Sequence, residues 1–384
     1  MTSTVAGPSG PPDTPILVLV RTLEIDSLDS FDAHAARSRH MRGWQLQELD
    51  LTGREGVLAR LDPAGALFLG CRLSPAAEDD LRHRGGLVFP SVPDVPFEAY
   101  RAHLYTPAEL YDGLEGGYDR TPDAQIYAWA LEANHVQTGG TSIRDSLAMA
   151  LHDNAIDDAL AEFADGRRIV GVMGGHAVDR GQPAYAEAVR LGKALAEAGY
   201  TVATGGGPGA MEAANLGATL AGAADAEVDE TLARIATVPS FKPSVTDWAR
   251  AGFAATDRVG DLSLGVPTWF YGHEPPNPFC TAIAKYFRNA IREDVLLRLC
   301  NAGIVFLPGA AGTVQEIFQA ACDNYYAAEA AQVPFVLVGK DHWAGELPAW
   351  QLLRGLGAGS PGFASRLALL DDPHEVPAAL GKEL

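Results

Sequence analysis

The strongest constraint on the fold is the rhythm of residues 167 to 384, in which short apolar runs alternate with amphipathic segments of helical length. The runs RRIVGVM (167–173), YTVATGG (200–206) and AGIVFLPG (302–309) are rich in valine and isoleucine, and a glycine-containing turn ends or follows each of them. Buried parallel strands have this composition when helices cover both faces of a sheet. The pattern therefore predicts an α/β fold with a Rossmann-like, doubly wound parallel sheet.

The same pattern predicts the remaining elements of this region. We expect further strands at 234–239, 262–270, 333–339 and 366–372, and helices at 182–199, 208–222, 280–301, 313–326, 347–356 and 374–380. The first two helices end in glycine, as helix C-termini prefer. Doubly wound sheets bind ligands beyond the carboxyl ends of their strands, so the loops at that edge are expected to hold the site.

Residues 15–166 show a less regular pattern. Strand-like runs such as LQELDL (46–51), ALFLGCRL (66–73) and GLVFPSV (86–92) alternate with polar turns, without a nucleotide loop, metal-ligand cluster or triad spacing. We predict a smaller N-terminal α/β domain whose role the sequence does not define. Residues 1–14 are predicted to be a disordered lead, which lacks the basic start of a signal peptide.

Composition excludes several classes of partner. The chain has 384 residues, more than one hydrophobic core usually serves, which agrees with two domains. A net charge of -20 repels nucleic acids and anionic membranes, and no apolar run approaches the roughly 20 residues that span a bilayer. Cys71, Cys280, Cys300 and Cys322 have no metal-ligand spacing and suit a reducing compartment. We expect a cytoplasmic protein without a metal.

Three glycine loops lie at predicted strand ends: MGGHAVDRG (173–181), TGGGPGAMEAAN (204–215) and PGAAGT (308–313). Glycine lets backbone amides approach a ligand, and a helix N-terminus adds unpaired N–H donors and partial positive charge. The expected ligand is therefore a phosphate. No loop is a GxxxxGK[ST] P-loop, and none is a GxGxxG with the acidic partner that NAD requires. The predicted phosphate-binding residues are Gly205, Gly206, Gly207, Gly209, Gly309, Gly312 and Thr313.

Glu316 follows the third loop and has two interpretations. Thr313 to Glu316 fits the capping box T-x-x-E, in which the glutamate returns to the helix backbone. Alternatively, the carboxylate faces a ligand at the sheet edge. Arg288 and Arg292, four residues apart, share one helix face, although the acidic Glu293 beside them also fits a solvated surface. An arginine and a glutamate flanking a phosphate pocket indicate chemistry at a sugar phosphate.

These motifs resemble a known family. PGAAGTVQE (308–316) is similar to the PGGxGTxxE signature of the LONELY GUY (LOG) family, phosphoribohydrolases that act on nucleoside monophosphates, and the resemblance covers about residues 167–382. GGH (174–176), GPGAMEA (207–213) and EPPNP (274–278) resemble the larger bacterial branch, the nucleotide 5'-monophosphate nucleosidases.

The resemblance implies roles for particular residues. The family's catalytic glutamate falls on Glu316, and its catalytic arginine falls on Arg292 if the preceding connection differs by one residue, so Arg288 remains an alternative. Ala310 departs from the glycine of short members. The resemblance also implies a homodimer or higher homo-oligomer and no cofactor. Further candidates for substrate binding are Gly174, Gly175, His176, Glu212, Glu274, Asn277 and Arg288.

The predicted activity is hydrolysis of the N-glycosidic bond of a nucleoside 5'-monophosphate to free base and ribose 5-phosphate. Such cleavage passes through an oxocarbenium-like sugar, which a carboxylate stabilises. The base stays open between an ordinary purine or pyrimidine and a cytokinin-type adenine. The alternative is a non-catalytic nucleotide or cofactor binding protein of the same fold, which would need the loops but not the carboxylate.

Overall fold

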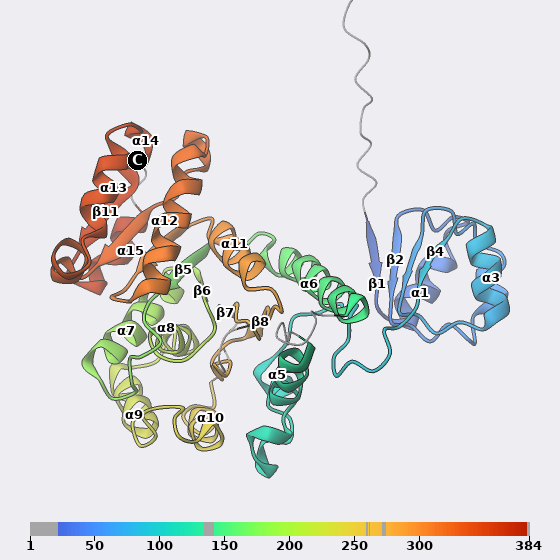
Figure 1. The fold of residues 1–384 in the computed structure, drawn as a ribbon, viewed down its shortest axis with the longest axis horizontal. Helices are drawn as coiled ribbons and strands as arrows, with labels where there is room; N and C mark the ends of the chain where they lie inside the picture. The colour runs from blue at the N-terminus through green and yellow to red at the C-terminus, as the bar shows by residue number, and fades with distance from the viewer. Residues whose placement is uncertain (1–21, 134–141, 259, 261, 271–273, 382–384) are drawn as a thin grey trace, which may run out of the picture. The chain divides into compact units, whose positions relative to one another are not determined.

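The computed structural model describes residues 22–133, 142–258, 260, 262–270 and 274–381 (Figure 1). The chain divides into two compact units, Met1–Ser91 and Val92–Leu384. The predicted lead at 1–14 lies outside the described residues. None of the helices in the described part of the chain is long and apolar enough to cross a membrane.

The first unit is built on a four-stranded parallel sheet with the sequential order β1-β2-β3-β4. Glu24, Gln45, Leu67 and Leu87 occupy equivalent positions on neighbouring strands, at intervals of 20 to 22 residues. This arrangement is a short solenoid, in which each turn of the chain stacks on the previous one. Its elements are β1 (Leu23–Ile25), α1 (Leu28–Ala35), β2 (Trp44–Gln47), α2 (Glu55–Leu58), β3 (Leu67–Leu69), α3 (Pro75–His83) and β4 (Leu87–Phe89).

A ladder of apolar side chains forms the core of the first unit. Ile25, Leu46, Phe68 and Val88 are register partners on the four strands, and all four are buried. Each strand thus contributes one large apolar side chain to a continuous row, and this core is buried only when the turns stack.

The second unit contains a seven-stranded parallel sheet with the order β11-β10-β9-β5-β6-β7-β8, which confirms the predicted doubly wound α/β fold (Figure 1). Alternate strand residues enter two separate cores, because successive side chains point to opposite faces. The strands are β5 (Ile169–Met173), β6 (Thr201–Thr204), β7 (Ser263–Gly265), β8 (Ala282–Ile283), β9 (Gly303–Phe306), β10 (Phe335–Val338) and β11 (Leu367–Leu370).

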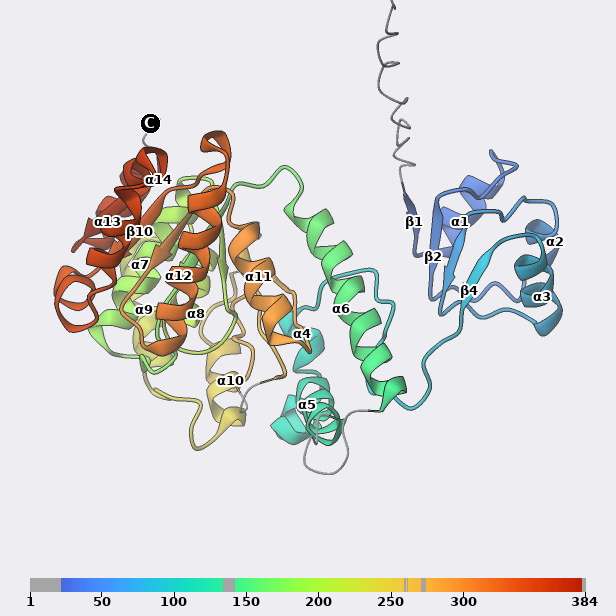
Figure 2. The same cartoon turned by 45° about the horizontal axis from the view of Figure 1, so that its top comes forward.

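Helices cover both faces of this sheet (Figure 2). Val170, Val202 and Val305 pack with α7, α8, α9 and α15 on one face, whereas Ile304 and Phe306 belong to the core that includes the other helices. The helices are α7 (Pro183–Glu197), α8 (Ala210–Thr219), α9 (Asp225–Ile235), α10 (Val245–Phe253), α11 (Asn289–Leu299), α12 (Ala311–Tyr326), α13 (Ala349–Gly357), α14 (Pro361–Arg366) and α15 (Val376–Leu380).

The strand order reverses at β5. From β5 the chain builds β6, β7 and β8 outward on one side, and then returns to place β9, β10 and β11 on the other. The loops that follow β5 and β9 therefore leave the sheet toward opposite faces. This reversal is the position at which doubly wound folds open a crevice at the carboxyl edge.

The boundary between the units differs from the one predicted at residue 166. Residues 92–164, which we call the accessory segment, contain α4 (Pro107–Leu110), α5 (Pro122–Ala133) and α6 (Ile143–Ala164) and belong to the second unit. Ile126 and Ile156 enter the same core as Ile169 and Leu264 of the sheet. The accessory segment therefore completes one face of the seven-stranded sheet.

Two local predictions are wrong. The strand expected at 234–239 is absent, because Asp225–Ile235 forms α9, with Val228 and Ile235 buried two turns apart. The helix expected from residue 280 begins only at Asn289, since Ala282–Ile283 pairs with β7 as the edge strand β8.

Candidate functional site

The loops that follow β5, β6 and β9 converge with the start of α12 on one pocket of about 360 Å³, a volume typical of small-ligand sites. The pocket therefore lies at the strand-order reversal, where the fold opens a crevice. It is lined by Gly174, Gly175, His176, Ala177, Gly205, Gly207, Met211, Pro267, Thr268, Glu274, Arg292, Glu293, Ala310, Ala311, Gly312, Thr313, Gln315 and Glu316.

The pocket brings together many of the predicted residues and leaves others outside. The predicted residues that line it are Gly174, Gly175, His176, Gly205, Gly207, Glu274, Arg292, Gly312, Thr313 and Glu316. Those that do not line it are Gly206, Gly209, Glu212, Asn277, Arg288 and Gly309.

Glu316 faces the pocket from the second turn of α12. Its side chain is 17% exposed, and its Oε1 lies 3.9 Å from Nη1 of Arg292. Among the described residues, no donor hydrogen-bonds to either carboxylate oxygen. Burial raises the pKa of Glu316 to about 7, against the opposing effect of the Arg292 charge, while Glu293 raises it further. Glu316 is thus a largely buried acid, ion-paired at long range with Arg292, whose charge changes near neutral pH.

The capping-box interpretation of Glu316 does not describe the start of α12. The N-cap residue is Ala310, which has no side-chain capping bond, and Thr313 lies inside the helix. The first helical amides, at Ala311, Gly312 and Thr313, have no acceptor within the described part of the chain. Such unpaired amides at a helix start favour an anion, and here they border the pocket beside Glu316.

Gly309 allows the third loop to pack closely against Thr313. A Cβ at this position would lie 2.2 Å from Oγ1 of Thr313, so only glycine fits. Nε2 of His342 lies 2.9 Å from the Gly309 carbonyl oxygen, and Nδ1 of His342 contacts Glu346. The loop is therefore supported by the segment that follows β10. Ala310, where the short LOG members have glycine, places its methyl group in the pocket wall.

Gly206 and Gly209 likewise shape the second loop. Both have positive φ, 72° and 78°, a conformation that side chains disfavour. A Cβ on Gly209 would lie 2.6 Å from the Gly175 carbonyl oxygen, so the first and second loops can touch only through glycine. Gly205 lies beside Arg292: a Cβ built on Gly205 would lie 3.7 Å from Nη1 of Arg292.

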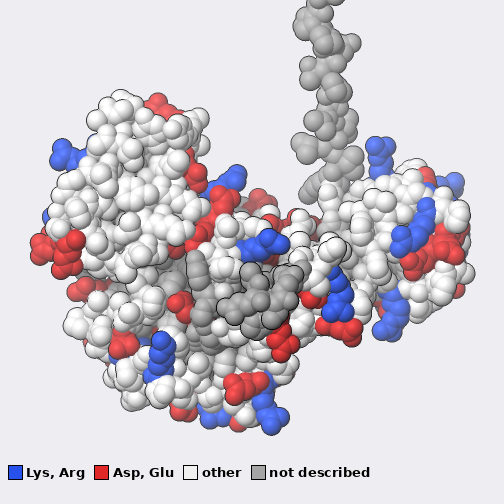
Figure 3. All heavy atoms as spheres, viewed as in Figure 1, with Lys and Arg blue, Asp and Glu red and all other residues white. Residues whose placement is uncertain are grey.

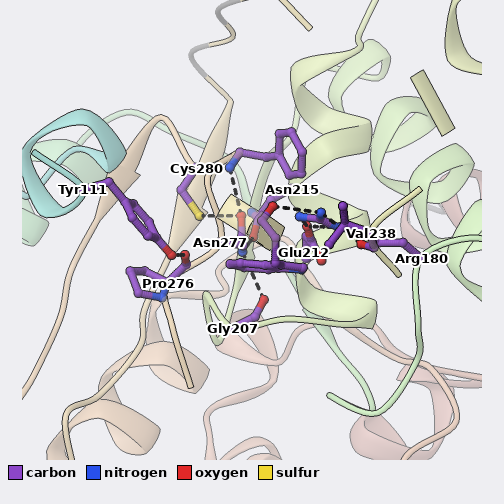
Figure 4. Close-up of polar contacts among 11 residues, drawn as sticks. Tyr111, Arg180, Gly207, Glu212, Asn215, Val238, Pro276, Asn277 and Cys280 are labelled. Atoms are coloured by element: carbon purple, nitrogen blue, oxygen red, sulfur yellow. Dashed lines mark hydrogen bonds and ion pairs between the residues drawn. The ribbon is translucent and has the colours of Figure 1, made fainter. Parts of the chain in front are cut away.

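Glu212 and Asn277 hold the framework behind the pocket (Figure 4). Glu212 forms a fully buried ion pair with Arg180, which connects α8 to the end of the first loop. Asn277 donates from Nδ2 to Asn215 Oδ1 at 2.9 Å and to the Gly207 carbonyl oxygen at 3.2 Å. Their polar groups are occupied by protein, so these two candidates position loops and do not contact the pocket.

The structure distinguishes the two arginines. Arg288 is the N-cap residue of α11, and its backbone N–H donates to Oδ2 of Asp153 at 3.1 Å. Arg292 lies one turn further on, is 9% exposed and lines the pocket beside Glu316. Of the two predicted candidates, Arg292 is therefore the one placed at the pocket.

His176 and Glu274 contribute polar groups from the first loop and from the segment before β8. Nδ1 of His176 lies 3.8 Å from Oε1 of Glu274, and both side chains are open to solvent. They form a polar part of the pocket rim.

Sequence reasoning missed a chain of hydrogen bonds that begins at Arg292. Oδ1 of Asn289 accepts from Nε and Nη2 of Arg292, at 3.1 and 2.6 Å. Nδ2 of Asn289 donates to Oε1 of Glu293, and Nε2 of Gln315 donates to Oε2 of Glu293, each at 2.7 Å. The available signal was spacing, since Asn289 precedes Arg292 by three residues and Glu293 by four on one helix.

The described residues contain no group of three or more His, Cys, Asp or Glu side chains arranged to hold a metal ion. Figure 3 shows acidic and basic side chains interspersed on the visible face, without a broad basic area. The pocket instead combines unpaired helix amides, the Arg292 guanidinium and the largely buried Glu316 carboxylate.

The geometry defines a doubly wound α/β fold whose crevice, at the strand-order reversal, is bordered by unpaired helix amides. The sequence is similar to the SLOG cluster4 family over residues 167–226, which run from β5 to the start of α9 and include the first two glycine loops. This match agrees with the resemblance to the LOG family. No curated protein matches the chain.

Solved structures of low identity also match. A molybdenum cofactor binding protein from Rippkaea orientalis is 16% identical, with 55% of this chain and 94% of that chain covered and a TM-score of 0.35. The molybdenum cofactor carrier protein of Chlamydomonas reinhardtii is 20% identical, with 56% and 96% covered and a TM-score of 0.34. These matches assign no ligand or activity to the chain.

Proposed function

We propose that the protein hydrolyses the N-glycosidic bond of a nucleoside 5'-monophosphate, releasing free base and ribose 5-phosphate. The observation that carries this proposal is Glu316, a carboxylate in the pocket that accepts no hydrogen bond from the described residues and whose pKa is raised to about 7. A protein that only binds phosphate gains nothing from such a group, because an anion in the same pocket would be repelled by it.

The 5'-phosphate is expected at the start of α12. The unpaired amides of Ala311, Gly312 and Thr313 offer donors there, and the helix dipole adds partial positive charge. This placement sets the ribose against the second turn of the same helix, which carries Glu316. One helix thus binds the phosphate and presents the carboxylate.

Glu316 would act in its ionised form. As the C–N bond breaks, positive charge develops on the sugar, and a carboxylate close to the anomeric carbon stabilises that charge and orients the attacking water. The water's proton passes to the carboxylate, whose raised pKa makes it an effective base near neutral pH. The leaving base departs with the electron pair of the C–N bond and then takes up the proton that the carboxylate received from water, which restores the ionised Glu316 and gives the neutral free base.

Arg292 would serve two purposes. Its guanidinium lowers the pKa of Glu316, and therefore keeps the carboxylate ionised despite burial. Its Nη1, which hydrogen-bonds to none of the described residues, can donate to the phosphate or to the leaving base.

The test is release of free base, measured by chromatography, from AMP, GMP, IMP, CMP, UMP and N6-isopentenyl AMP. We expect the wild type to release base from at least one of these nucleotides and Glu316→Gln to lose that activity. Glu230→Gln is the matched control, because Glu230 is an exposed carboxylate paired with Arg234 on α9. Stoichiometric AMP binding without base release would instead support a non-catalytic nucleotide binding protein, since the loops and the amides of α12 suffice for binding.

A further inference from the structure

We propose that Asn289 is a positioning residue, whose amide oxygen holds the Arg292 guanidinium so that Nη1 faces Glu316 and the second glycine loop. The inference rests on the proposed function and adds a residue that acts through Arg292.

The hydrogen bonds of Arg292 define its orientation. Both Nε and Nη2 donate to the single Oδ1 of Asn289, which occupies one edge of the planar guanidinium. The remaining nitrogen, Nη1, lies 3.9 Å from Oε1 of Glu316, too far for a hydrogen bond. Asn289 therefore leaves one nitrogen of Arg292 directed at the pocket.

Asn289 also holds Arg292 against the pull of a second carboxylate. Nη2 of Arg292 is ion-paired with Oε1 of Glu293 at 3.6 Å, a distance too long for a hydrogen bond. The amide nitrogen of Asn289 donates to this oxygen, and Gln315 donates to the other. An arginine side chain has many rotamers, so holding it in one of them preserves the pocket geometry before substrate arrives.

These hydrogen bonds predict that substitutions of Asn289 and Glu293 have opposite effects on the ionisation of Glu316. The charged groups near Glu316 are Arg292 and Glu293 of α11, with His176 and Glu274 elsewhere on the pocket wall. Loss of Asn289 frees Arg292 to move away from Glu316, whereas Glu293→Gln removes a negative charge beside it. The loss of Asn289 therefore destabilises the ionised form of Glu316, whereas Glu293→Gln stabilises it.

The experiment is a double-mutant cycle on the full-length chain, with kcat/KM for the best nucleotide measured across pH. We expect Asn289→Ala to lower kcat/KM by about 10- to 100-fold, as small misplacements of catalytic groups do. In the Arg292→Ala background the same substitution should change kcat/KM by less than about threefold, because interacting residues are not additive. Asn154→Ala, at an exposed asparagine on α6, is the control.

The pH profile separates positioning from a merely structural role. The acid limb of kcat/KM should move to higher pH in Asn289→Ala and to lower pH in Glu293→Gln. Additive losses in the cycle, or acid limbs that stay in place, would overturn the role of Asn289 while base release by the wild type upholds the proposed function.

If the wild type releases no base, the proposed function fails, and the same four proteins are compared by calorimetric AMP binding. A loss of AMP affinity in Asn289→Ala that disappears in the Arg292→Ala background would still support the positioning role. Additive losses, or no AMP binding by the wild type, would overturn it.

Discussion

The two sheets of this chain are both parallel, yet only one has the topology of a ligand site. In the first unit the strands follow in sequential order, so every connection advances in the same direction. Right-handed crossovers then place every connection on the same face of the sheet, so that successive loops stack on one another. In the second unit the order reverses at β5, and the loops after β5 and β9 separate around a pocket. Strand order, more than strand composition, therefore locates the candidate site.

The largest predicted effect concerns the buried charges that attach the accessory segment to the rest of the second unit. Asp123 of α5 accepts from Lys285, Tyr118 and Trp269, and both members of the Asp123–Lys285 pair are fully buried. Asp123→Ala would leave Lys285 as an unpaired buried cation and should cost about 3–5 kcal/mol in the free energy of unfolding of the second unit.

Calorimetry of the full chain measures this effect. We expect the transition of the second unit to move to lower temperature while that of the first unit stays in place. The double replacement Asp123→Asn with Lys285→Met, which removes both charges, should recover part of the loss. A common shift of both transitions would show that the two units unfold together and would contradict their independent stability.

Glu316→Gln tests the proposed catalytic role of the carboxylate in the pocket at the strand-order reversal. We predict a loss of about 10²–10³ in kcat with little change in fold, as is typical when a group that stabilises transition-state charge is removed. Asp50→Asn, at an exposed carboxylate of the first unit, should leave kcat unchanged. Steady-state base release from both variants makes the comparison, and equal losses would contradict a site confined to the second unit.

The sequence predicts a feature of the fold well when the residues that determine the feature are close together in the chain. The glycine loops and their strands were predictable because each depends on a few adjacent residues. The accessory segment was not, because α6 buries His152 and Asp153, which resemble surface residues in a sequence. Asp153 accepts from the amides of Phe287 and Arg288, a contact across more than 130 positions that fixes the start of α11.

The choice between the two arginines depended on the same contact. A helix predicted from residue 280 leaves both within its interior, whereas the observed start at Asn289 makes Arg288 a cap and turns Arg292 toward the pocket. The solenoid repeat was also missed, because its equivalent positions Glu24, Gln45, Leu67 and Leu87 mix polar and apolar residues, and only the alternate apolar ladder is regular.

The pH dependence of stability gives a solution test that Glu316 is a buried acid at the pocket and not a helix cap. Its folded pKa, about 7, exceeds the ordinary value of 4.5, so the folded state binds the proton more tightly than the unfolded state. This contribution is fully present below about pH 4.5 and is lost as pH rises through 7. At pH 8 the ionised side chain costs about 3 kcal/mol, from 1.36 kcal/mol for each pKa unit.

Glu316→Gln should therefore stabilise the second unit at pH 8 by up to about 3 kcal/mol and change little at pH 4. A capping role would give the reverse, a loss of stability of about 1 kcal/mol at neutral pH. Urea unfolding at the two pH values decides between them. Loss of activity combined with a gain of stability would mark Glu316 as a group kept for function at the expense of the fold.

The smallest predicted effect is on activity when the first unit is weakened. Leu46 occupies the middle of the apolar ladder, between Ile25 and Phe68, and is fully buried. Leu46→Ala should cost about 2–5 kcal/mol in the unfolding of the first unit, since a buried leucine leaves a cavity when truncated. Because the pocket is built entirely from residues of the second unit, base release should change by less than about twofold. A larger fall in kcat, at a temperature where the second unit stays folded, would show that the solenoid acts on the site and that the two sheets share one function.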